Sequence, residues 1–225
     1  LMQDYALGAT KNGSIIYWQI DTKGKVRTGK IMKYDPNTGH RVKDGGGINW
    51  IHAIMKKQGL LPDNYHLVQC LFGEHLLKMH PTKVVALVES EKSALIASGV
   101  YPDYIWLATG GKSQLSIDKL KVLQGRTVVM FPDVDGFEYW SNKAKEVETI
   151  GCKVVVSDLL EKNATDEDRA NKIDIADWLI RSLSESTVTE VKTAIKEAEK
   201  TLQAMIEANP ALQLLIDTFN LELVA

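Results

Sequence analysis

The chain has 225 residues, of which 44% are hydrophobic and 25% charged, and its formal net charge is -2 at pH 7. This composition supplies the apolar side chains of a buried core and excludes a disordered polyampholyte, and no apolar stretch reaches the roughly 20 residues that span a bilayer. Two cysteines, Cys70 and Cys152, exclude a disulfide scaffold and a zinc site built from cysteines alone, so we expect a protein of the reducing cytoplasm with no membrane span.

Positive charge is concentrated in the first 60 residues. They carry ten Lys and Arg side chains against four Asp, whereas the rest of the chain carries 17 basic and 25 acidic side chains. A basic part joined to an acidic part is typical of a protein that binds a polyanion with one part and gathers carboxylates around cations with the other. A solvated basic surface without a partner is the equally weighted alternative, because the excess of charge is modest.

Residues 1–80 are expected to form a basic N-terminal subdomain with a small antiparallel sheet. The predicted elements are a strand at 14–20, a strand at 26–34 and a short helix at 48–57. The strands are rich in β-branched and aromatic residues and are separated by a Lys-Gly turn, and the helix shows apolar residues at helical spacing. The first four residues form neither an initiator nor a signal peptide, so we expect the chain to be a piece of a longer protein.

From residue 81 to 185, short apolar runs alternate with helical stretches. Strands are predicted at 84–88, 104–107, 127–131 and 153–156, and helices at 91–98, 113–121 and 137–150. Runs that are apolar on both faces and joined by helices predict an α/β fold with a parallel sheet flanked by helices. Ligands of such a sheet bind beyond the carboxyl ends of its strands.

The remaining residues, 186–225, are predicted to be a helical C-terminal appendage. Thr187 and Glu190 have the spacing of a capping box, and the apolar residues that follow recur every three or four positions. A last helix is predicted over 211–220. The apolar stripe is shorter than three heptads, so packing on the chain's own domain is favoured over a dimerising coil.

Acidic side chains follow two of the predicted strands, at the edge where ligands are expected. Glu89 follows the strand at 84–88, and Asp133 and Asp135 follow the strand at 127–131. Three carboxylates at one edge repel one another strongly unless a hard divalent cation neutralises them, which predicts a site for Mg²⁺ or Mn²⁺. A turn whose Asp side chains cap the next helix is the alternative interpretation of the Asp-x-Asp-Gly pattern.

This constellation resembles the Toprim domain that topoisomerases and primases share. The similar segments, within residues 83–182, are 85–95 with Glu89, a glycine turn at 108–111, 131–136 with Asp133 and Asp135, and a later acidic motif at 172–179. Upstream, residues 15–34 and 71–76 look like the small basic subdomain that precedes Toprim in bacterial-type primases, which favours a primase over a topoisomerase. The divergence is similar to that of primase-like proteins in bacterial mobile elements.

The sequence departs from the family pattern in several places. Ser90 stands where primases have Gly, and Gly136-Phe137 follows the second Asp, although neither change removes a ligand. No Cys-rich zinc ribbon precedes the core, and no helicase-binding domain is evident. Template binding of the replicative kind is therefore expected upstream of Leu1 or not at all.

The resemblance implies a metal-dependent phosphoryl transfer on nucleotides. It implies Glu89, Asp133 and Asp135 as catalytic residues, and the same three residues with Asp174 as ligands of Mg²⁺ or Mn²⁺. The implied partners are single-stranded DNA template and nucleoside triphosphates, with a helicase as a further candidate. The side chains and glycines expected to contact nucleic acid or nucleotide are Lys30, Lys33, Arg41, Lys43, Gly110, Gly111 and Lys112.

Two classes of function remain open on the sequence. The first is a DNA primase-like nucleotidyltransferase that synthesises primers on single-stranded DNA. The second is a nucleic-acid-binding regulatory Toprim module of a mobile element, which keeps the fold without polymerising. Phosphodiester cleavage by a Toprim nuclease uses the same metal ligands and is not separated from synthesis by sequence.

Overall fold

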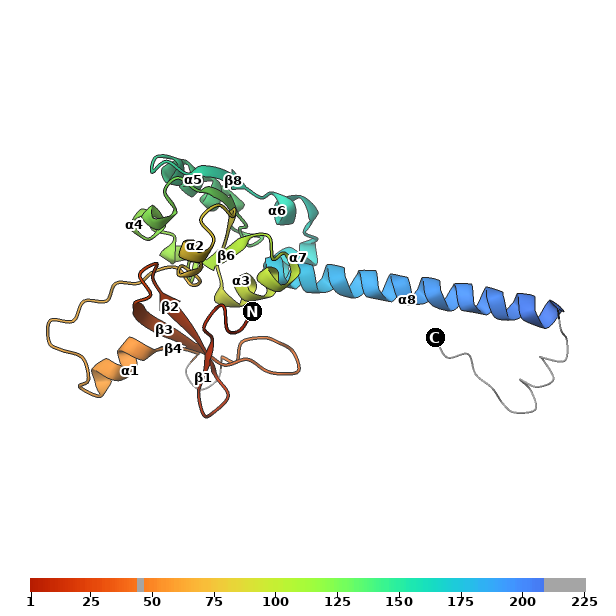
Figure 1. Cartoon of the computed structure of the whole chain (residues 1–225), viewed down its shortest axis with the longest axis horizontal. Coiled ribbons are helices and arrows are strands. Elements are labelled where there is room, and N and C mark those ends of the chain that lie inside the picture. The colour runs from red at the N-terminus through yellow and green to blue at the C-terminus, as the bar shows by residue number, and fades with distance from the viewer. Residues whose placement is uncertain (44–46, 209–225) are drawn as a thin grey trace. The chain divides into compact units, whose positions relative to one another are not determined.

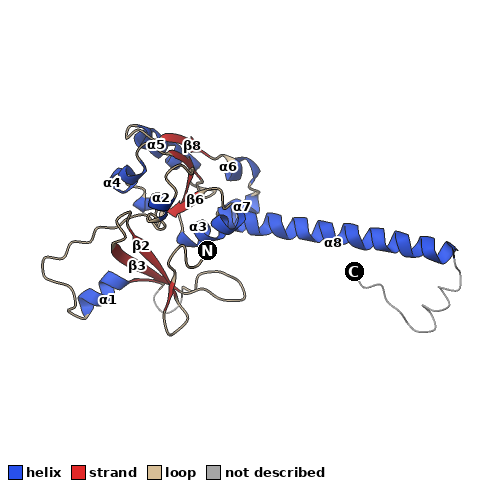
Figure 2. Cartoon of the chain, in the orientation of Figure 1, coloured by secondary structure: helices blue, strands red, loops and turns tan. Residues whose placement is uncertain are grey.

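Two four-stranded sheets organise the N-terminal part of the protein (Figures 1 and 2), in a computed structural model that describes residues 1–43 and 47–208. The chain divides into two compact units, Leu1–Trp178 and Leu179–Ala225, and both sheets belong to the first. The predicted boundaries near residues 80 and 185 stay predictions. No helix in the described ranges combines the length and the apolar character that crossing a bilayer requires.

The first sheet is antiparallel, with strand order β1-β2-β3-β4. Its elements are β1 (Gly8–Ala9), β2 (Ile15–Ile20), β3 (Val26–Met32) and β4 (Ile48–Trp50), followed by helix α1 (Ile51–Lys57). Both predicted strands are confirmed. The predicted helix over 48–57 is wrong in its first turn, because residues 48–50 pair with the end of β3 before the helix begins.

The second sheet is parallel throughout, with order β6-β5-β7-β8, and confirms the predicted α/β fold class. Its strands are β5 (Val85–Val88), β6 (Ile105–Ala108), β7 (Thr127–Met130) and β8 (Lys153–Val156). Every residue of β5 and β6 is buried, as expected for strands covered on both faces. Helix α3 (Glu91–Val100) packs on β5 and β6, and α5 (Phe137–Glu148) packs on β8.

The helix predicted at 113–121 is broken into three short pieces. These are the 3₁₀ helix η1 (Lys112–Gln114), α4 (Ile117–Leu120) and the 3₁₀ helix η2 (Lys121–Leu123). The break occurs because Ser116 has extended backbone angles, with φ -104° and ψ 144°. The other short helices are α2 (Leu76–Met79), α6 (Leu159–Asn163) and α7 (Asp166–Asn171).

Helix α8 runs without interruption over Ile175–Ala208. The predicted capping box at Thr187 is therefore wrong as a helix start, since this position lies inside α8. No Gly or Pro stands within α8 to end the helix earlier, and Asp174 supplies the cap in its place. The helix predicted over 211–220 lies outside the described residues.

Aromatic side chains join the antiparallel sheet to the parallel sheet. Tyr17 of β2 meets Phe72 edge to face, with 5.5 Å between ring centroids, and Phe72 also stacks on Tyr5 at 5.2 Å. The backbone of Phe72 exchanges two hydrogen bonds, of 3.0 and 3.2 Å, with Ala108 at the end of β6. The segment around Phe72 thus extends the parallel sheet and carries the antiparallel sheet on its aromatic side chain.

Substitution of Gly73 tests this junction. Its φ is +80°, and an added Cβ would lie 3.0 Å from the Trp106 carbonyl oxygen and 3.0 Å from the Leu107 side chain. Gly24, with φ +79° and nothing within 4 Å of an added Cβ, is the matched control. We expect Gly24→Ala to lower the free energy of unfolding by about 1 kcal/mol, from backbone strain alone, and Gly73→Ala by about 1–3 kcal/mol more, from crowding. Urea denaturation of the two variants measures the difference, and equal losses would contradict a tightly packed junction.

Candidate active site

Three carboxylates lie at the carboxyl ends of the two central strands of the parallel sheet. Glu89 directly follows β5, and Asp133 and Asp135 lie in the loop after β7. Because β5 and β7 pair in parallel, the loops that follow them leave the sheet at the same edge. The structure therefore places these three predicted site residues on the edge where the sequence predicts ligands to bind.

The Glu89 backbone is held between a helix cap and a glycine turn. Ser90 caps α3 by accepting a 3.1 Å hydrogen bond from the Ser93 N–H. The Gly110 N–H donates a 3.0 Å bond to the Glu89 carbonyl oxygen. Gly110 and Gly111 have φ of +92° and +144°, a path that side-chain-bearing residues rarely follow. The two predicted glycines therefore lie beside Glu89.

The loop after β7 is a turn, but its Asp side chains do not cap the following helix. The Gly136 N–H donates a 2.8 Å bond to the Asp133 carbonyl oxygen, which closes the turn. Gly136 is the N-cap of α5, and no side chain caps that helix end. The capping alternative for the Asp-x-Asp-Gly pattern is therefore wrong, and both carboxylates are available for other interactions.

Asp174 joins the same edge and is tied to two helices. Its Oδ1 accepts bonds of 2.8 and 3.1 Å from the backbone N–H groups of Ala176 and Asp177, at the start of α8. Its Oδ2 accepts a 2.6 Å bond from the Ser93 hydroxyl of α3. These bonds use part of the hydrogen-bonding capacity of the carboxylate and fix its position.

The neighbouring carboxylates and burial change the protonation of Asp133 and Glu89. Burial raises the pKa of Asp133 from 3.8 to about 8, and the charges of Glu89, Asp174 and Asp135 act in the same direction. Burial also raises the pKa of Glu89, and the Asp135 charge adds to this rise, while the backbone and charge of Lys112 oppose it. The edge thus concentrates negative charge where solvent screens it poorly.

Two lysines lie next to Asp135. Lys112 Nζ is 3.9 Å from Asp135 Oδ1 and 3.3 Å from the Asp135 carbonyl oxygen, and Lys172 Nζ is 3.7 Å from Asp135 Oδ2. Both lysine side chains reach solvent, with Lys112 43% and Lys172 73% exposed, so each pair contributes little to stability. The two lysines nevertheless reduce the net negative charge around Asp135, on the solvent-exposed side of the acidic edge.

The donor chemistry of this edge fits Mg²⁺ or Mn²⁺, because all the candidate ligands are carboxylate oxygens. Among the side chains that the structure describes, however, no group of three or more His, Cys, Asp or Glu is placed so that it could hold a metal ion. The carboxylates share an edge of the sheet without forming a closed ligand set. A metal site at this edge is therefore a proposal that rests on donor type and charge.

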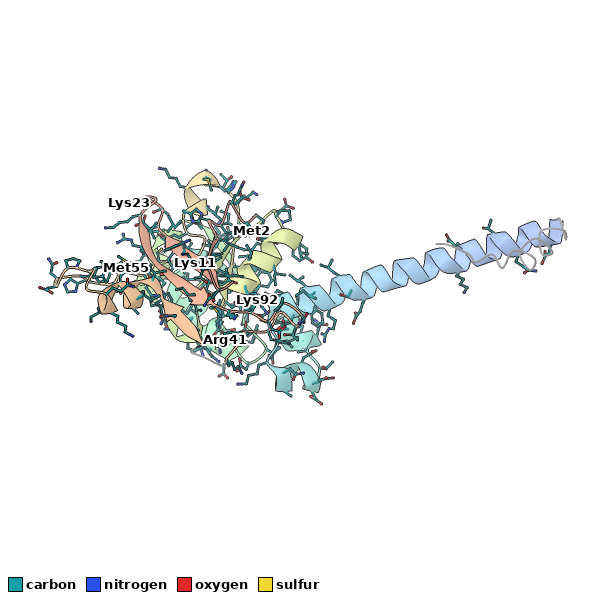
Figure 3. The ribbon with its side chains drawn as sticks, turned by 90° about the horizontal axis from the view of Figure 1, so that it is seen from below. Met2, Lys11, Lys23, Arg41, Met55 and Lys92 are labelled. Atoms are coloured by element: carbon teal, nitrogen blue, oxygen red, sulfur yellow. The ribbon has the colours of Figure 1, made fainter. Side chains whose placement is uncertain are left out.

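A cavity of about 530 Å³ adjoins the acidic edge. Its lining combines the acids Asp133 and Asp174 with four basic side chains, and Figure 3 labels two of these, Arg41 and Lys92. The complete lining is Met32, Tyr34, His40, Arg41, Lys43, Ser90, Lys92, Asp133, Lys172 and Asp174. A volume of this size suits a small-molecule ligand, and the basic side chains suit an anionic one.

Two cavity lysines, Lys92 and Lys172, were missed by the sequence analysis as anion-binding candidates. Each stands close in sequence to an acidic site residue, Lys92 three positions after Glu89 and Lys172 two positions before Asp174. This closeness in sequence to an acidic site residue is the feature that could have identified both lysines. The predicted Arg41 and Lys43 do line the cavity.

The expected contact of Lys30 with nucleic acid is corrected by the structure. Lys30 is only 5% exposed, and its Nζ lies 2.9 Å from Glu91 Oε2, so its charge is used inside the protein. Lys33, by contrast, is exposed but does not line the cavity. The basic surface of the antiparallel sheet is therefore smaller than the sequence predicts.

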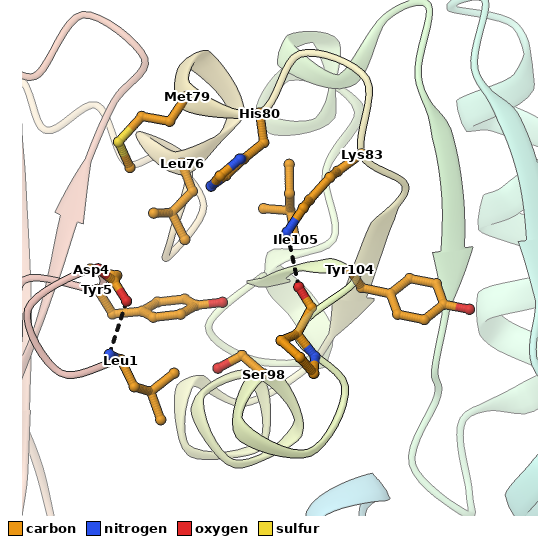
Figure 4. Close-up of a pocket in the computed structure, with 11 residues that line it drawn as sticks. Leu1, Asp4, Tyr5, Leu76, Met79, His80, Lys83, Ser98, Tyr104 and Ile105 are labelled. Atoms are coloured by element: carbon orange, nitrogen blue, oxygen red, sulfur yellow. Dashed lines mark hydrogen bonds and ion pairs between the residues drawn. The ribbon is translucent and has the colours of Figure 1, made fainter.

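A second cavity, of about 290 Å³, lies elsewhere in the first unit (Figure 4). Its lining includes Tyr5, His80, Lys83 and Ile105. Lys83 precedes β5 and Ile105 begins β6, so this cavity lies at the amino ends of these strands. It contains none of the predicted site residues. The cavity at the carboxyl edge is therefore the better candidate for the active site.

The raised pKa of Asp133 predicts how its substitution changes stability with pH. The folded protein keeps a proton on Asp133 that the unfolded chain releases between pH 3.8 and about 8, so this group destabilises the fold as pH rises through that window. We expect Asp133→Asn, in EDTA, to match wild type near pH 4 and to exceed it at pH 8 by an amount on the order of a few kcal/mol. Denaturation across this pH range measures the gap. The exposed Asp118→Asn serves as control, and a gap that does not depend on pH would contradict the crowding of carboxylates.

Comparisons with solved structures give low similarity to primases. The primase fragment of the bacteriophage T7 primase-helicase protein is 15% identical, with a TM-score of 0.43 over 76% of this chain and 68% of that one. The Aquifex aeolicus primase (zinc binding and RNA polymerase domains) is 17% identical, with a TM-score of 0.47 over 86% of this chain and 48% of that one. The E. coli primase catalytic core is 14% identical, with a TM-score of 0.42 over 82% and 63%. At these values the likenesses establish neither an activity nor a partner for this chain.

A comparison with families of sequences places the chain in a family. No curated protein matches the sequence. A family model with the description "Domain of unknown function (DUF6371)" matches residues 1–134, a range that includes both Glu89 and Asp133. Because the match covers more than half of the 225 residues, the chain belongs to the DUF6371 family.

Proposed function

We propose that this protein is a metal-dependent nucleotidyltransferase of the Toprim primase type, which synthesises primers on a single-stranded DNA template. The observation that carries the proposal is the position of Glu89 and Asp133 at the ends of paired parallel strands, beside a cavity lined by basic side chains. Order and spacing of the acidic motifs support it independently. The DUF6371 match covers both residues without naming an activity.

The residues of the site divide into two groups with different tasks. Glu89, Asp133 and Asp135, with Asp174 beside them, would hold Mg²⁺ or Mn²⁺, which when bound supplies charge neutralisation for phosphoryl transfer. Burial raises the pKa of Glu89, which suits this carboxylate to accept a proton from a reacting hydroxyl.

The basic group would position the phosphates. Arg41 and Lys43 come from the connection after β3, whereas Lys92 comes from α3 and Lys172 from the residues before α8. Cations from three separate segments surround the cavity, so an anion bound there would be contacted from several sides. A nucleoside triphosphate has the charge and the size that this cavity accepts.

A regulatory nucleic-acid-binding module is the second candidate, and one observation favours it. Lys112 and Lys172 lie within 4 Å of Asp135, and the described carboxylates form no closed ligand set. Lysines that balance the acidic edge would allow the fold to persist without a metal ion. In that case the protein would bind nucleic acid without transferring nucleotides.

Metal-dependent stability and activity test the enzyme proposal directly. Bound Mn²⁺ relieves the repulsion among the carboxylates and stabilises the fold by mass action, so Mn²⁺ should raise the Tm of wild type by several degrees. Asp133→Asn and Asp135→Asn should lose this shift. With Mn²⁺, single-stranded template and nucleoside triphosphates, wild type should form new strands that both variants fail to form.

The control for the metal experiment is Asp118→Asn, which removes an exposed carboxylate outside the site and should keep the full Tm shift. Absence of a shift in wild type, or its retention in the Asp133 and Asp135 variants, contradicts the metal proposal. A shift without synthesis favours the regulatory module, and shortening of the template strand favours a nuclease.

Nucleic-acid binding should depend on the basic side chains near the cavity. Replacing Lys33, Arg41 and Lys43 together by Ala should weaken single-stranded DNA binding, and the slope of log Kd against log salt should fall by roughly 2, because up to three phosphate contacts are lost. Two of these three residues, Arg41 and Lys43, line the cavity, and replacing Lys11, Lys23 and Lys25, which are exposed and of which none lines it, is the charge-matched control. Equal changes of slope in the two triple variants would assign the binding to net charge alone.

A further inference from the structure

A buried ion pair ties the antiparallel sheet to the start of α3. Lys30 Nζ of β3 lies 2.9 Å from Glu91 Oε2 and donates a 3.1 Å hydrogen bond to the Gly110 carbonyl oxygen. Lys30 is 5% exposed and Glu91 is 1% exposed. Three segments that are distant in the sequence therefore meet at one ammonium group.

The groups that Lys30 contacts also hold the backbone of Glu89. Glu91 stands two residues after Glu89, in the first turn of α3. Gly110, whose carbonyl oxygen accepts a bond from Lys30, donates its own N–H to the Glu89 carbonyl oxygen at 3.0 Å. Lys30 thus restrains Glu89 from both sides, along the chain through Glu91 and across the sheet through the glycine turn.

Stability alone gives a weak reason for this arrangement. A buried ion pair is often no more stabilising than two apolar side chains of similar volume, because both charges lose their hydration. Glu91 Oε1 is also buried without a hydrogen-bond partner among the described residues. An added Cβ on Gly110 would lie 3.3 Å from this oxygen, so the carboxylate fills the space beneath the glycine turn.

We propose that Lys30 and Glu91 are positioning residues, which hold Glu89 and the glycine turn in place at the edge where the divalent cation is proposed to bind. The effect on cation binding rests on the proposed function. The restraint that Lys30 places on the glycine turn does not depend on it. The ammonium supplies two directional bonds to fixed acceptors, which an apolar pair of equal volume lacks. Lys30 acts through Glu89 and does not itself contact the cavity.

The double variant Lys30→Met/Glu91→Leu separates positioning from folding. It removes both charges and keeps the volume, so its metal-free Tm should equal or exceed that of wild type. Amide hydrogen exchange at Gly110 should become at least 10-fold faster, while the Phe131 amide, which donates to the Leu87 carbonyl within the sheet, should keep its rate. Mn²⁺ affinity, read from the electron paramagnetic resonance signal of free Mn²⁺, should fall at least 10-fold.

Two further variants complete the experiment. Lys143→Met/Glu146→Leu makes the same chemical change at an exposed pair on α5 and should alter neither Gly110 exchange nor Mn²⁺ affinity. Glu91→Gln leaves the buried Lys30 ammonium without its counter-charge and weakens the pair, so Gly110 exchange should become faster and Mn²⁺ affinity should fall. This variant also reports on the pair if the double variant does not fold.

The outcomes distinguish this inference from the proposed function. Wild type that binds no Mn²⁺ overturns the metal-dependent function, whereas Gly110 exchange still decides whether Lys30 restrains the turn. A folded double variant with unchanged Gly110 exchange, or with wild-type Mn²⁺ affinity when wild type binds the ion, overturns the positioning role. If the double variant does not fold, a folded Glu91→Gln variant with unchanged Gly110 exchange overturns it as well.

Discussion

Repulsion among carboxylates at one edge of the parallel sheet is the interaction around which the rest of the site is arranged. It follows from topology, because adjacent parallel strands β5 and β7 deliver Glu89 and Asp133 to the same edge. Burial adds to the cost of negative charge at this edge, because it is the main cause of the raised pKa of both groups. A fold with this feature has to neutralise the charge, either with protons, with its own cations or with bound metal ions.

Lysine side chains neutralise carboxylates both at the surface and in the interior of the first unit. At the open side, Lys112 and Lys172 approach Asp135, where water screens the interaction. In the interior, Lys30 is paired with Glu91, so the carboxylate nearest to Glu89 along the chain adds little net charge to the edge. The antiparallel sheet therefore has two contributions: it provides one wall of the cavity and it supplies the buried cation that fixes the start of α3.

The sequence allowed the parallel sheet and its acidic edge to be predicted, since fully apolar runs and carboxylates after them are local signals. No local pattern in the sequence indicates that Lys30 is buried. In the sequence Lys30 is a charged residue of a strand in a basic segment, and only its contacts with Glu91 and Gly110, both distant along the chain, account for its burial. The start of α8 was misplaced for a similar reason, because Asp174 acts as a cap only when the chain before it has been positioned by tertiary contacts.

Charge balance also limits how the proposed enzyme can bind its substrate. Lys172 lies 3.7 Å from Asp135 and lines the cavity as well, so the same ammonium serves an acidic side chain and faces the place of an incoming anion. A phosphate that attracted Lys172 would leave Asp135 with less neutralising charge, and Asp135 would then favour a divalent cation more strongly. Under the proposed function, cation and anion binding are thus coupled through one lysine, and each makes the binding of the other more favourable. The regulatory alternative lacks this coupling, because without the cation an anion and Asp135 compete for Lys172.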